Sequence, residues 1–329
     1  MAVPERVFVF RKVPFHERIA EILSPVAEIT FHDTEDPPSE AKVRAVLPEA
    51  TGLLPTALDP IPAARIEAAP RLRVIGNYGV GYNNIDVGAA TRRGIAVTNT
   101  PGVLTEATAD TTWALIMAAT RRTVEADAFV RAGKFNGWRA SLFLGMELAG
   151  KIHGIIGLGL IGQAVARRGL AFGMRVIYCG RRQAAPDVEA ALHAAFVPLE
   201  QLLREADVVS VHCPLTPETR HLLDARRLAL MKPTAYLINT ARGPIVEEAA
   251  LVEALRARRI AGAGLDVYEE EPKVAPGLAD LPNVVLFPHI GSSTLDAREG
   301  MARLAAQNIR AALEGRRPAN LVNPDVWRS

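Results

Sequence analysis

Short apolar segments alternate with helix-like segments along most of the chain. In the first hundred residues, five apolar segments predict strands, and residues 62–69 are typical of a connecting helix. Such alternation is typical of parallel βαβ units. The predicted strands are residues 7–10, 28–31, 51–55, 73–76 and 95–98.

Six more strands are predicted from residue 152 onward, with helices between most of them, such as 199–205 and 247–258. The later strands are continuous apolar runs, which indicates a sheet covered on both faces. This pattern predicts a doubly wound α/β fold, whose ligands lie beyond the carboxyl ends of the strands. The six strands are residues 152–157, 175–179, 208–213, 235–239, 261–267 and 284–287.

A glycine fingerprint follows the first strand of this second set. Gly157, Gly159 and Gly162 have the G-x-G-x-x-G spacing, and the residues after them predict a helix. Gly157 permits a tight turn, Gly159 lets phosphates approach the backbone, and Gly162 lets the helix pack on its strand. The free N–H groups at the start of a helix suit a pyrophosphate, so a dinucleotide site is predicted.

The end of the next strand indicates which dinucleotide binds. An NAD site usually carries Asp or Glu there to bind the ribose hydroxyls, but this chain has Gly180, Arg181 and Arg182. Two guanidiniums suit a 2′-phosphate, so NADPH is predicted over NADH, with NADH as the weaker cofactor. The alternative is that both arginines are ordinary solvated charges.

Composition narrows the class of protein. The 38 basic and 36 acidic residues nearly balance, which disfavours nucleic-acid binding, and no uninterrupted apolar run is long enough for a membrane span. The first residues lack the apolar core of a signal peptide. Cys179 and Cys213 are interpreted as small apolar residues in a reducing compartment, and no metal site is predicted. A cytoplasmic globular protein is expected.

Two domains are expected from the length and from the position of the fingerprint. Residues 99–289 are predicted to form the dinucleotide-binding domain, and residues 1–98 together with 290–329 the other domain, to which a final helix at 294–315 returns. Thr105 is predicted as the N-cap of a long helix, with Glu106 in its first turn and a hinge at 99–102 before it. Residues 135–148 are predicted to be extended and to pack outside their own domain.

Three strand ends carry groups suited to chemistry. Arg242 follows one strand, Asp266 and three successive glutamates end the next, and His289 ends the last. This set suits reduction of a 2-oxo acid, because a guanidinium can grip the acid and an imidazole beside a carboxylate can donate a proton. From the residues alone, Glu269 and Glu270 compete with Glu271 for the carboxylate role. Four other histidines are interpreted as structural: His153, His193, His212 and His221.

Several of these motifs, in this order, resemble the D-isomer-specific 2-hydroxyacid dehydrogenases, and among them the glyoxylate/hydroxypyruvate reductases. The resemblance covers nearly the whole chain. It rests on residues 77–86, 100–105, the fingerprint, 239–243, 264–267, 271–272 and 288–292.

The resemblance implies a doubly wound Rossmann cofactor domain inserted in a flavodoxin-like substrate domain, and a homodimer. It implies Arg242, Glu271 and His289 as the catalytic set, because the family's glutamate directly precedes a proline. It also implies substrate contacts from Leu54, the backbone N–H groups of Val80 and Gly81, and Trp138 of the partner subunit. Cofactor contacts are implied for Thr105, Gly157, Gly159, Leu160, Ile161, Gly162, Gly180, Arg181, Arg182, Cys213, Pro214, Thr219, Thr240, Ala241, Asp266 and Gly291.

The chain departs from the family at Leu160, which replaces an arginine often found inside the glycine turn and removes one phosphate contact. The predicted function is NADPH-dependent reduction of glyoxylate and hydroxypyruvate to glycolate and D-glycerate. Two alternatives stay open: a reductase of bulkier 2-oxo acids, and a cofactor-sensing co-regulator built on the same fold.

Overall fold

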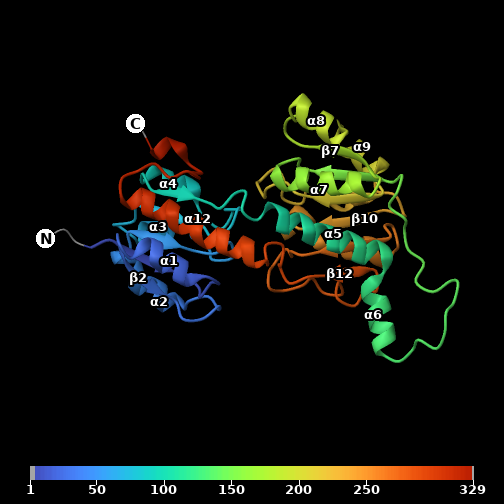
Figure 1. The fold of residues 1–329 in the computed structure, drawn as a ribbon, viewed down its shortest axis with the longest axis horizontal. Helices are drawn as coiled ribbons and strands as arrows, with labels where there is room; N and C mark the ends of the chain where they lie inside the picture. Colours follow the sequence, from blue (N-terminus) through green and yellow to red (C-terminus); the bar gives the residue numbers. More distant parts are fainter. Residues whose placement is uncertain (1–3, 328–329) are drawn as a thin grey trace. The chain divides into compact units, whose positions relative to one another are not determined.

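A computed structural model describes residues 4–327 and divides the chain into two compact units (Figure 1). The first unit contains the chain up to Leu104 and again from Ser293, and the second is Thr105–Ser292. The expected domain boundaries, 98/99 and 289/290, lie a few residues before these positions. The second unit is thus an insertion in the first.

The first unit is built on a five-stranded parallel sheet with the order β2-β1-β3-β4-β5. This is the flavodoxin-like order, in which the chain reverses direction between β1 and β3. Its strands are β1 (Arg6–Val9), β2 (Glu28–Phe31), β3 (Gly52–Leu54), β4 (Val74–Gly76) and β5 (Ala96–Thr98). Its helices are α1 (His16–Leu23), α2 (Glu40–Val46), η1 (Leu47–Glu49), α3 (Ala63–Glu67), α4 (Val87–Arg92), α12 (Leu295–Leu313) and η3 (Pro324–Val326).

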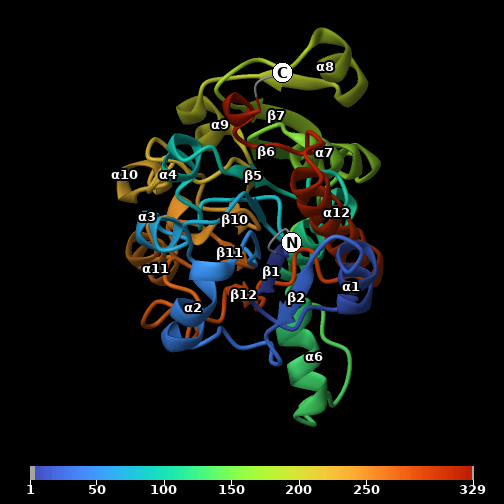
Figure 2. The ribbon, with the colours of Figure 1, turned by 90° about the vertical axis from the view of Figure 1, so that its left-hand side faces the viewer.

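Helices cover both faces of this sheet, with α1 beside α12 and the shorter helices opposite (Figure 2). On the α12 side, Ile309 packs against Gly52 and Gly76, and a side chain at Gly76 would clash with it. On the other side, Phe8, Leu53 and Ile75 pack among apolar residues of α2, α3 and α4. The predicted return of the last helix to the N-terminal half is therefore correct.

The second unit is built on a parallel sheet with the order β12-β11-β10-β9-β6-β7-β8. It has seven strands among the described residues, whereas the sequence predicted six, because β8 is a three-residue edge strand with little buried apolar surface. Its strands are β6 (Ile152–Ile156), β7 (Arg175–Cys179), β8 (Ala194–Phe196), β9 (Val208–Val211), β10 (Tyr236–Asn239), β11 (Gly262–Leu265) and β12 (Val284–Leu286). Its helices are α5 (Thr105–Arg121), α6 (Thr123–Arg131), α7 (Leu160–Ala171), α8 (Pro186–Leu192), α9 (Leu199–Glu205), α10 (Ala225–Leu228), η2 (Gly243–Ile245) and α11 (Glu248–Arg256).

Two hydrophobic cores lie on opposite faces of this sheet. Two adjacent residues of β6 belong to different cores: Ile155 packs with α5 and α7, and Ile156 packs with α9, α10 and α11. Successive side chains of a strand point to opposite faces, so continuous apolar strands require both layers of helices. The predicted doubly wound Rossmann fold is confirmed.

The helix α5 begins at Thr105 itself, so Thr105 is its first residue rather than the predicted N-cap. At its other end the chain continues into α6 and then into residues 132–151, which form no helix or strand and extend away from the sheet of their unit (Figure 1). Phe135, Trp138 and Leu144 of this segment are more than half exposed.

In the part of the chain that the structure describes, no helix is long and apolar enough to cross a membrane.

Candidate active site

The glycine turn connects β6 to α7 at the switch point of the second sheet, where β6 lies beside β9. Gly157 has a φ of +98°, and a side chain there would clash with the backbone of Cys213. A side chain at Gly162 would clash with the carbonyl of Gly157, whereas Gly159 faces open space. These surroundings match the three predicted roles: a turn, close helix packing, and room for a ligand beside the start of α7. Leu160 and Ile161, its first two residues, are exposed and half-buried respectively.

Arg181 and Arg182 follow β7, after Gly180, and all three residues are exposed. Among residues 4–327, neither guanidinium is within ion-pair distance of a carboxylate. The positive charge of the nearby Arg181 lowers the pKa of the Cys213 thiol. Burial nevertheless dominates and raises the pKa of Cys213 to about 11 and that of Cys179 to about 12, so both thiols are protonated at neutral pH.

Other residues predicted to contact the cofactor lie in loops after β9 and β10. The hydroxyl of Thr219 donates to the carbonyl of Pro214 at 2.7 Å, which fixes the loop that follows Cys213. The hydroxyl of Thr240 bonds to that of Thr112 on α5 at 2.8 Å, and Ala241 donates its N–H to the side chain of Asn239. The sequence did not single out Thr112 or Asn239, because a polar residue near a strand end carries no sign of its partner.

Arg242 is positioned by the turn after β10. Asn239 Nδ2 donates to the Arg242 carbonyl at 2.9 Å, and the guanidinium Nη1 donates to the carbonyl of Ala241 at 2.7 Å. Burial lowers the pKa of Arg242, and the charge of Glu271 opposes this effect. A partly desolvated guanidinium near a carboxylate suits the forked binding of an acid.

His289 and Glu271 form a hydrogen-bonded pair. His289 Nδ1 lies 2.8 Å from Glu271 Oε2, and the other carboxylate oxygen accepts the N–H of Tyr268 at 3.0 Å. Burial alone would raise the pKa of Glu271, but the bond to His289 and the charges of His289 and Arg242 lower it. The structure therefore brings Arg242, Glu271 and His289 together, and Nε2 is the imidazole nitrogen left for proton transfer.

Asp266 holds the loop that carries His289. Its two carboxylate oxygens accept the N–H groups of Ile290 and Gly291, each at 2.7 Å, and the residue is 1% exposed. His289 itself has a left-handed backbone with a φ of +56°. Burial raises the pKa of Asp266, although the two N–H groups and the charge of His289 favour its carboxylate. The residue predicted to bind the cofactor thus also fixes the loop that carries the imidazole.

The structure separates the three candidate glutamates. Glu271 contacts His289, whereas Glu269 pairs with His221 and also bonds to the backbone of Glu248. His221, which the sequence analysis interpreted as structural, thus also faces a carboxylate. Glu248, which the sequence did not single out, accepts the N–H of Glu269 at 2.7 Å and is 5% exposed.

The other predicted substrate contacts differ in their exposure. Leu54 is fully buried at the end of β3. Val80 and Gly81 are half-buried in the loop after β4, whereas Trp138 is 83% exposed. Tyr268 is a further residue that the sequence did not indicate, and its hydroxyl donates to the carbonyl of Phe287 at 2.8 Å, next to the His289 loop.

Comparison with known proteins connects this geometry to one family. Residues 113–291 match the family described as "D-isomer specific 2-hydroxyacid dehydrogenase, NAD binding domain". A glyoxylate reductase from Thermococcus litoralis is 48% identical over 329 residues, which cover 98% of each chain.

Solved structures agree over nearly the full length. The TT0316 protein from Thermus thermophilus superposes with a TM-score of 0.89 at 47% identity, covering 96% of this chain and 99% of the other. An NADPH-dependent glyoxylate/hydroxypyruvate reductase from Sinorhizobium meliloti, solved with NADP and malonate, has a TM-score of 0.87 at 34% identity, covering 99% of each chain.

Proposed function

Because this chain belongs to the D-isomer-specific 2-hydroxyacid dehydrogenase family, we propose that it reduces glyoxylate and hydroxypyruvate to glycolate and D-glycerate with NADPH. The single observation that carries the proposal is the group formed by Arg242, Glu271 and His289 in the unit with the glycine turn. When bound, the reduced nicotinamide supplies the hydride. The relative from Thermococcus litoralis, named a glyoxylate reductase, supports the choice of substrate.

Arg242, His289 and Glu271 have separate roles in the reaction. Arg242 grips the carboxylate and the carbonyl oxygen of the 2-oxo acid through its fork of N–H groups, which fixes the ketone carbon. His289 donates a proton from Nε2 to the carbonyl oxygen as that oxygen gains negative charge. Glu271 accepts from Nδ1, so it orients the ring and leaves Nε2 for the substrate.

The residues at the cofactor end suit NADPH. The open space at Gly159 admits a pyrophosphate, and the exposed Arg181 and Arg182 can bind a 2′-phosphate where an NAD site would carry a carboxylate. The Sinorhizobium meliloti structure, described as NADPH-dependent and solved with NADP, supports the same preference. We propose NADH as the weaker cofactor.

A substrate panel followed by NADPH absorbance tests the proposal. Glyoxylate and hydroxypyruvate should give the highest kcat/KM, bulkier 2-oxo acids should give lower values, and NADH should be the poorer cofactor. A protein that binds NADPH but turns over none of the 2-oxo acids would contradict the proposal and favour a cofactor sensor. A higher kcat/KM for the bulkier acids would contradict the substrate assignment alone.

A further inference from the structure

The loop at residues 77–84 follows β4 at the carboxyl edge of the five-stranded sheet. It lies beside the loop after β3, because Thr56 and Tyr78 form a parallel bridge. The chain reverses between β1 and β3, and ligands of open α/β sheets bind outside such carboxyl ends. Val80 and Gly81 are half-buried and Tyr82 is 42% exposed, so the tip of this loop is accessible.

The carbonyl groups of three successive residues in this loop are bound by amide donors. Asn77 Nδ2 donates to the carbonyl of Gly81 at 2.9 Å and to that of Gly79 at 3.3 Å. Asn99 Nδ2 donates to the carbonyl of Val80 at 2.8 Å. The side chains of Asn77 and Asn99 therefore fix the orientation of these three peptide groups.

A trans peptide bond points its C=O and the following N–H in opposite directions. Fixing the carbonyls of Gly79, Val80 and Gly81 therefore turns the next three N–H groups, those of Val80, Gly81 and Tyr82, away from the asparagines. Among residues 4–327, none of these three N–H groups has an acceptor. Successive N–H groups of this kind form a concave site for an anion.

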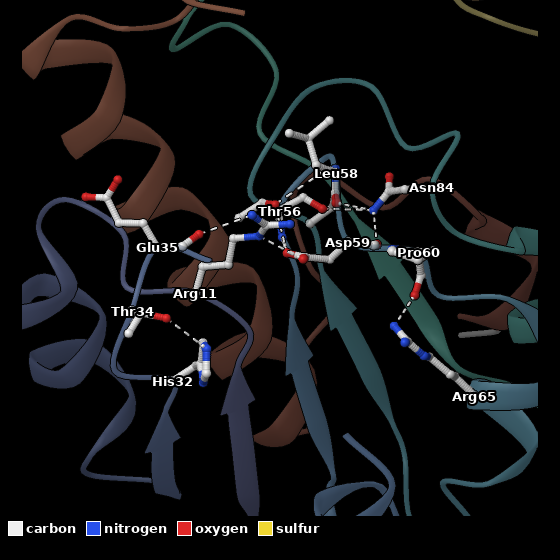
Figure 3. A network of polar contacts seen from close by, with 11 residues as sticks. Arg11, His32, Thr34, Glu35, Thr56, Leu58, Asp59, Pro60, Arg65 and Asn84 are labelled. Carbon is white, nitrogen blue, oxygen red and sulfur yellow. Dashed lines mark hydrogen bonds and ion pairs between the residues drawn. The ribbon is translucent and has the colours of Figure 1, made fainter. Parts of the chain in front are cut away.

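Asn77 is itself held in place by a second asparagine. Asn84 Nδ2 lies 3.2 Å from Asn77 Oδ1. It also lies 3.0 Å from the carbonyls of both Thr56 and Asp59 (Figure 3). Asn77 is fully buried, so its orientation is set by these bonds rather than by solvent. The two asparagines tie the loop after β4 to the loop after β3.

The same network removes a charge that would oppose an anion. Asp59 is 1% exposed, and Arg11 Nε donates to Asp59 Oδ1 at 2.8 Å (Figure 3). The other oxygen, Oδ2, accepts both the N–H and the hydroxyl of Thr56 at 2.8 Å. Because the guanidinium neutralises the buried carboxylate, Asp59 does not oppose an anion at the three N–H groups.

We propose that Asn77 and Asn84 are positioning residues that aim the N–H groups of Val80, Gly81 and Tyr82 at the carboxylate of the 2-oxo acid. This role rests on the proposed function, and it adds Tyr82 to the two N–H donors implied by the family resemblance. Asn77 acts directly on the loop, and Asn84 acts through Asn77.

The test compares Asn77→Ala and Asn84→Ala with Asn323→Ala. Asn323 is a buried asparagine of the same unit that bonds to Ile95 and Val97 away from this loop, so its loss reports on stability alone. Asn77→Ala should raise KM for glyoxylate about 10-fold or more, and Asn84→Ala by a smaller factor, because misdirected N–H groups lose charge-assisted bonds. KM for NADPH should stay unchanged in both variants, and kcat should fall less than KM rises.

Asn84→Ala keeps the test decisive if Asn77→Ala does not fold. The positioning role would be overturned if the folded variants kept the wild-type KM for glyoxylate and lost only as much stability as Asn323→Ala. That result would leave the proposed reaction intact. Absence of turnover of any 2-oxo acid by the wild-type protein would instead contradict the proposed function, and the positioning role with it.

Discussion

We propose that Arg181 and Arg182 set the choice of cofactor. Replacing both by alanine should raise KM for NADPH by roughly 10-fold or more, because a bond between a guanidinium and a phosphate is charge-assisted. KM for NADH should hardly change, since NADH lacks the 2′-phosphate. Steady-state kinetics with each cofactor measures both values.

Arg204→Ala is the matched control, because Arg204 is an exposed arginine of α9 in the same unit. It should leave both KM values as they are. Equal losses with NADPH and NADH in the double variant would show that the arginines do not recognise the 2′-phosphate.

His153 makes the stability of the protein depend on pH. It is fully buried on β6, and burial lowers its pKa from 6.5 to about 3. The unfolded chain therefore binds a proton between these values that the folded chain does not, so the stabilising effect is complete above pH 6.5 and is lost as the pH falls toward 3. Between about pH 7.5 and about pH 5, this residue should remove about 2 kcal/mol from the free energy of unfolding.

His153→Gln provides the comparison, because glutamine can keep a bond to Ser210, which lies 2.8 Å from His153 Nε2. Urea unfolding at both pH values should show a smaller loss for the variant than for the wild type. An identical loss would mean that His153 is not the titrating group. His212, whose pKa burial also lowers to about 3, remains in both proteins, so part of the loss persists in the variant.

The loop from Tyr268 to Glu271 is held by α11 as well as by its own strand. Glu248 at the start of α11 and Glu269 in the loop accept each other's N–H groups. Glu248→Ala should lower kcat by roughly 10-fold, because Glu271 follows Glu269 by two residues and a small displacement of a catalytic group is costly. Turnover of glyoxylate and the midpoint of thermal unfolding are measured together.

Glu253→Ala is the control on the same helix, since Glu253 is exposed and pairs only locally with Arg256. Its kcat should match that of the wild type. A Glu248→Ala protein that loses stability but keeps full kcat would mean that the bonds between Glu248 and Glu269 do not position Glu271.

The sequence predicts an element well where its signal is local. Continuous apolar strands and the glycine spacing correctly predicted both sheets and the turn at Gly157. The strand β8 was missed because an exposed edge strand of three residues has neither a buried run nor a clear alternation. Thr105 was assigned as a cap because its residue type favours that position, but the helix already begins there.

The partners of side chains could not be predicted in the same way. Three consecutive glutamates are equivalent by pattern, and only the folded loop turns Glu271 toward His289 and Glu269 toward His221. Bonds such as those of Asp266 with Ile290 and Gly291 join residues about two dozen positions apart. Family resemblance selected Glu271 where the residues alone could not.

At the level of the whole molecule, we propose that two chains form a homodimer. The segment at residues 132–151 exposes Phe135, Trp138 and Leu144, and large exposed apolar residues in one segment indicate an interaction site. Sedimentation equilibrium should give a mass about twice the 35.4 kDa of the chain. Trp138→Ser should weaken the dimer.

Leu295→Ser serves as the control for that change, because Leu295 is 77% exposed in the other unit. It should leave the dimer unchanged. A wild-type protein that sediments as a monomer at micromolar concentration would rule out the proposed assembly.

We propose that His289 supplies the proton that accompanies hydride transfer. Single-turnover oxidation of NADPH by glyoxylate tests it most directly, with His289→Ala compared with the wild type and with His16→Ala, an exposed histidine of the first unit beside Glu17. We expect His289→Ala to bind NADPH normally but to react about 100-fold more slowly or worse, and His16→Ala to react like the wild type. A His289→Ala protein that reacts at nearly the wild-type rate would rule out this role of His289.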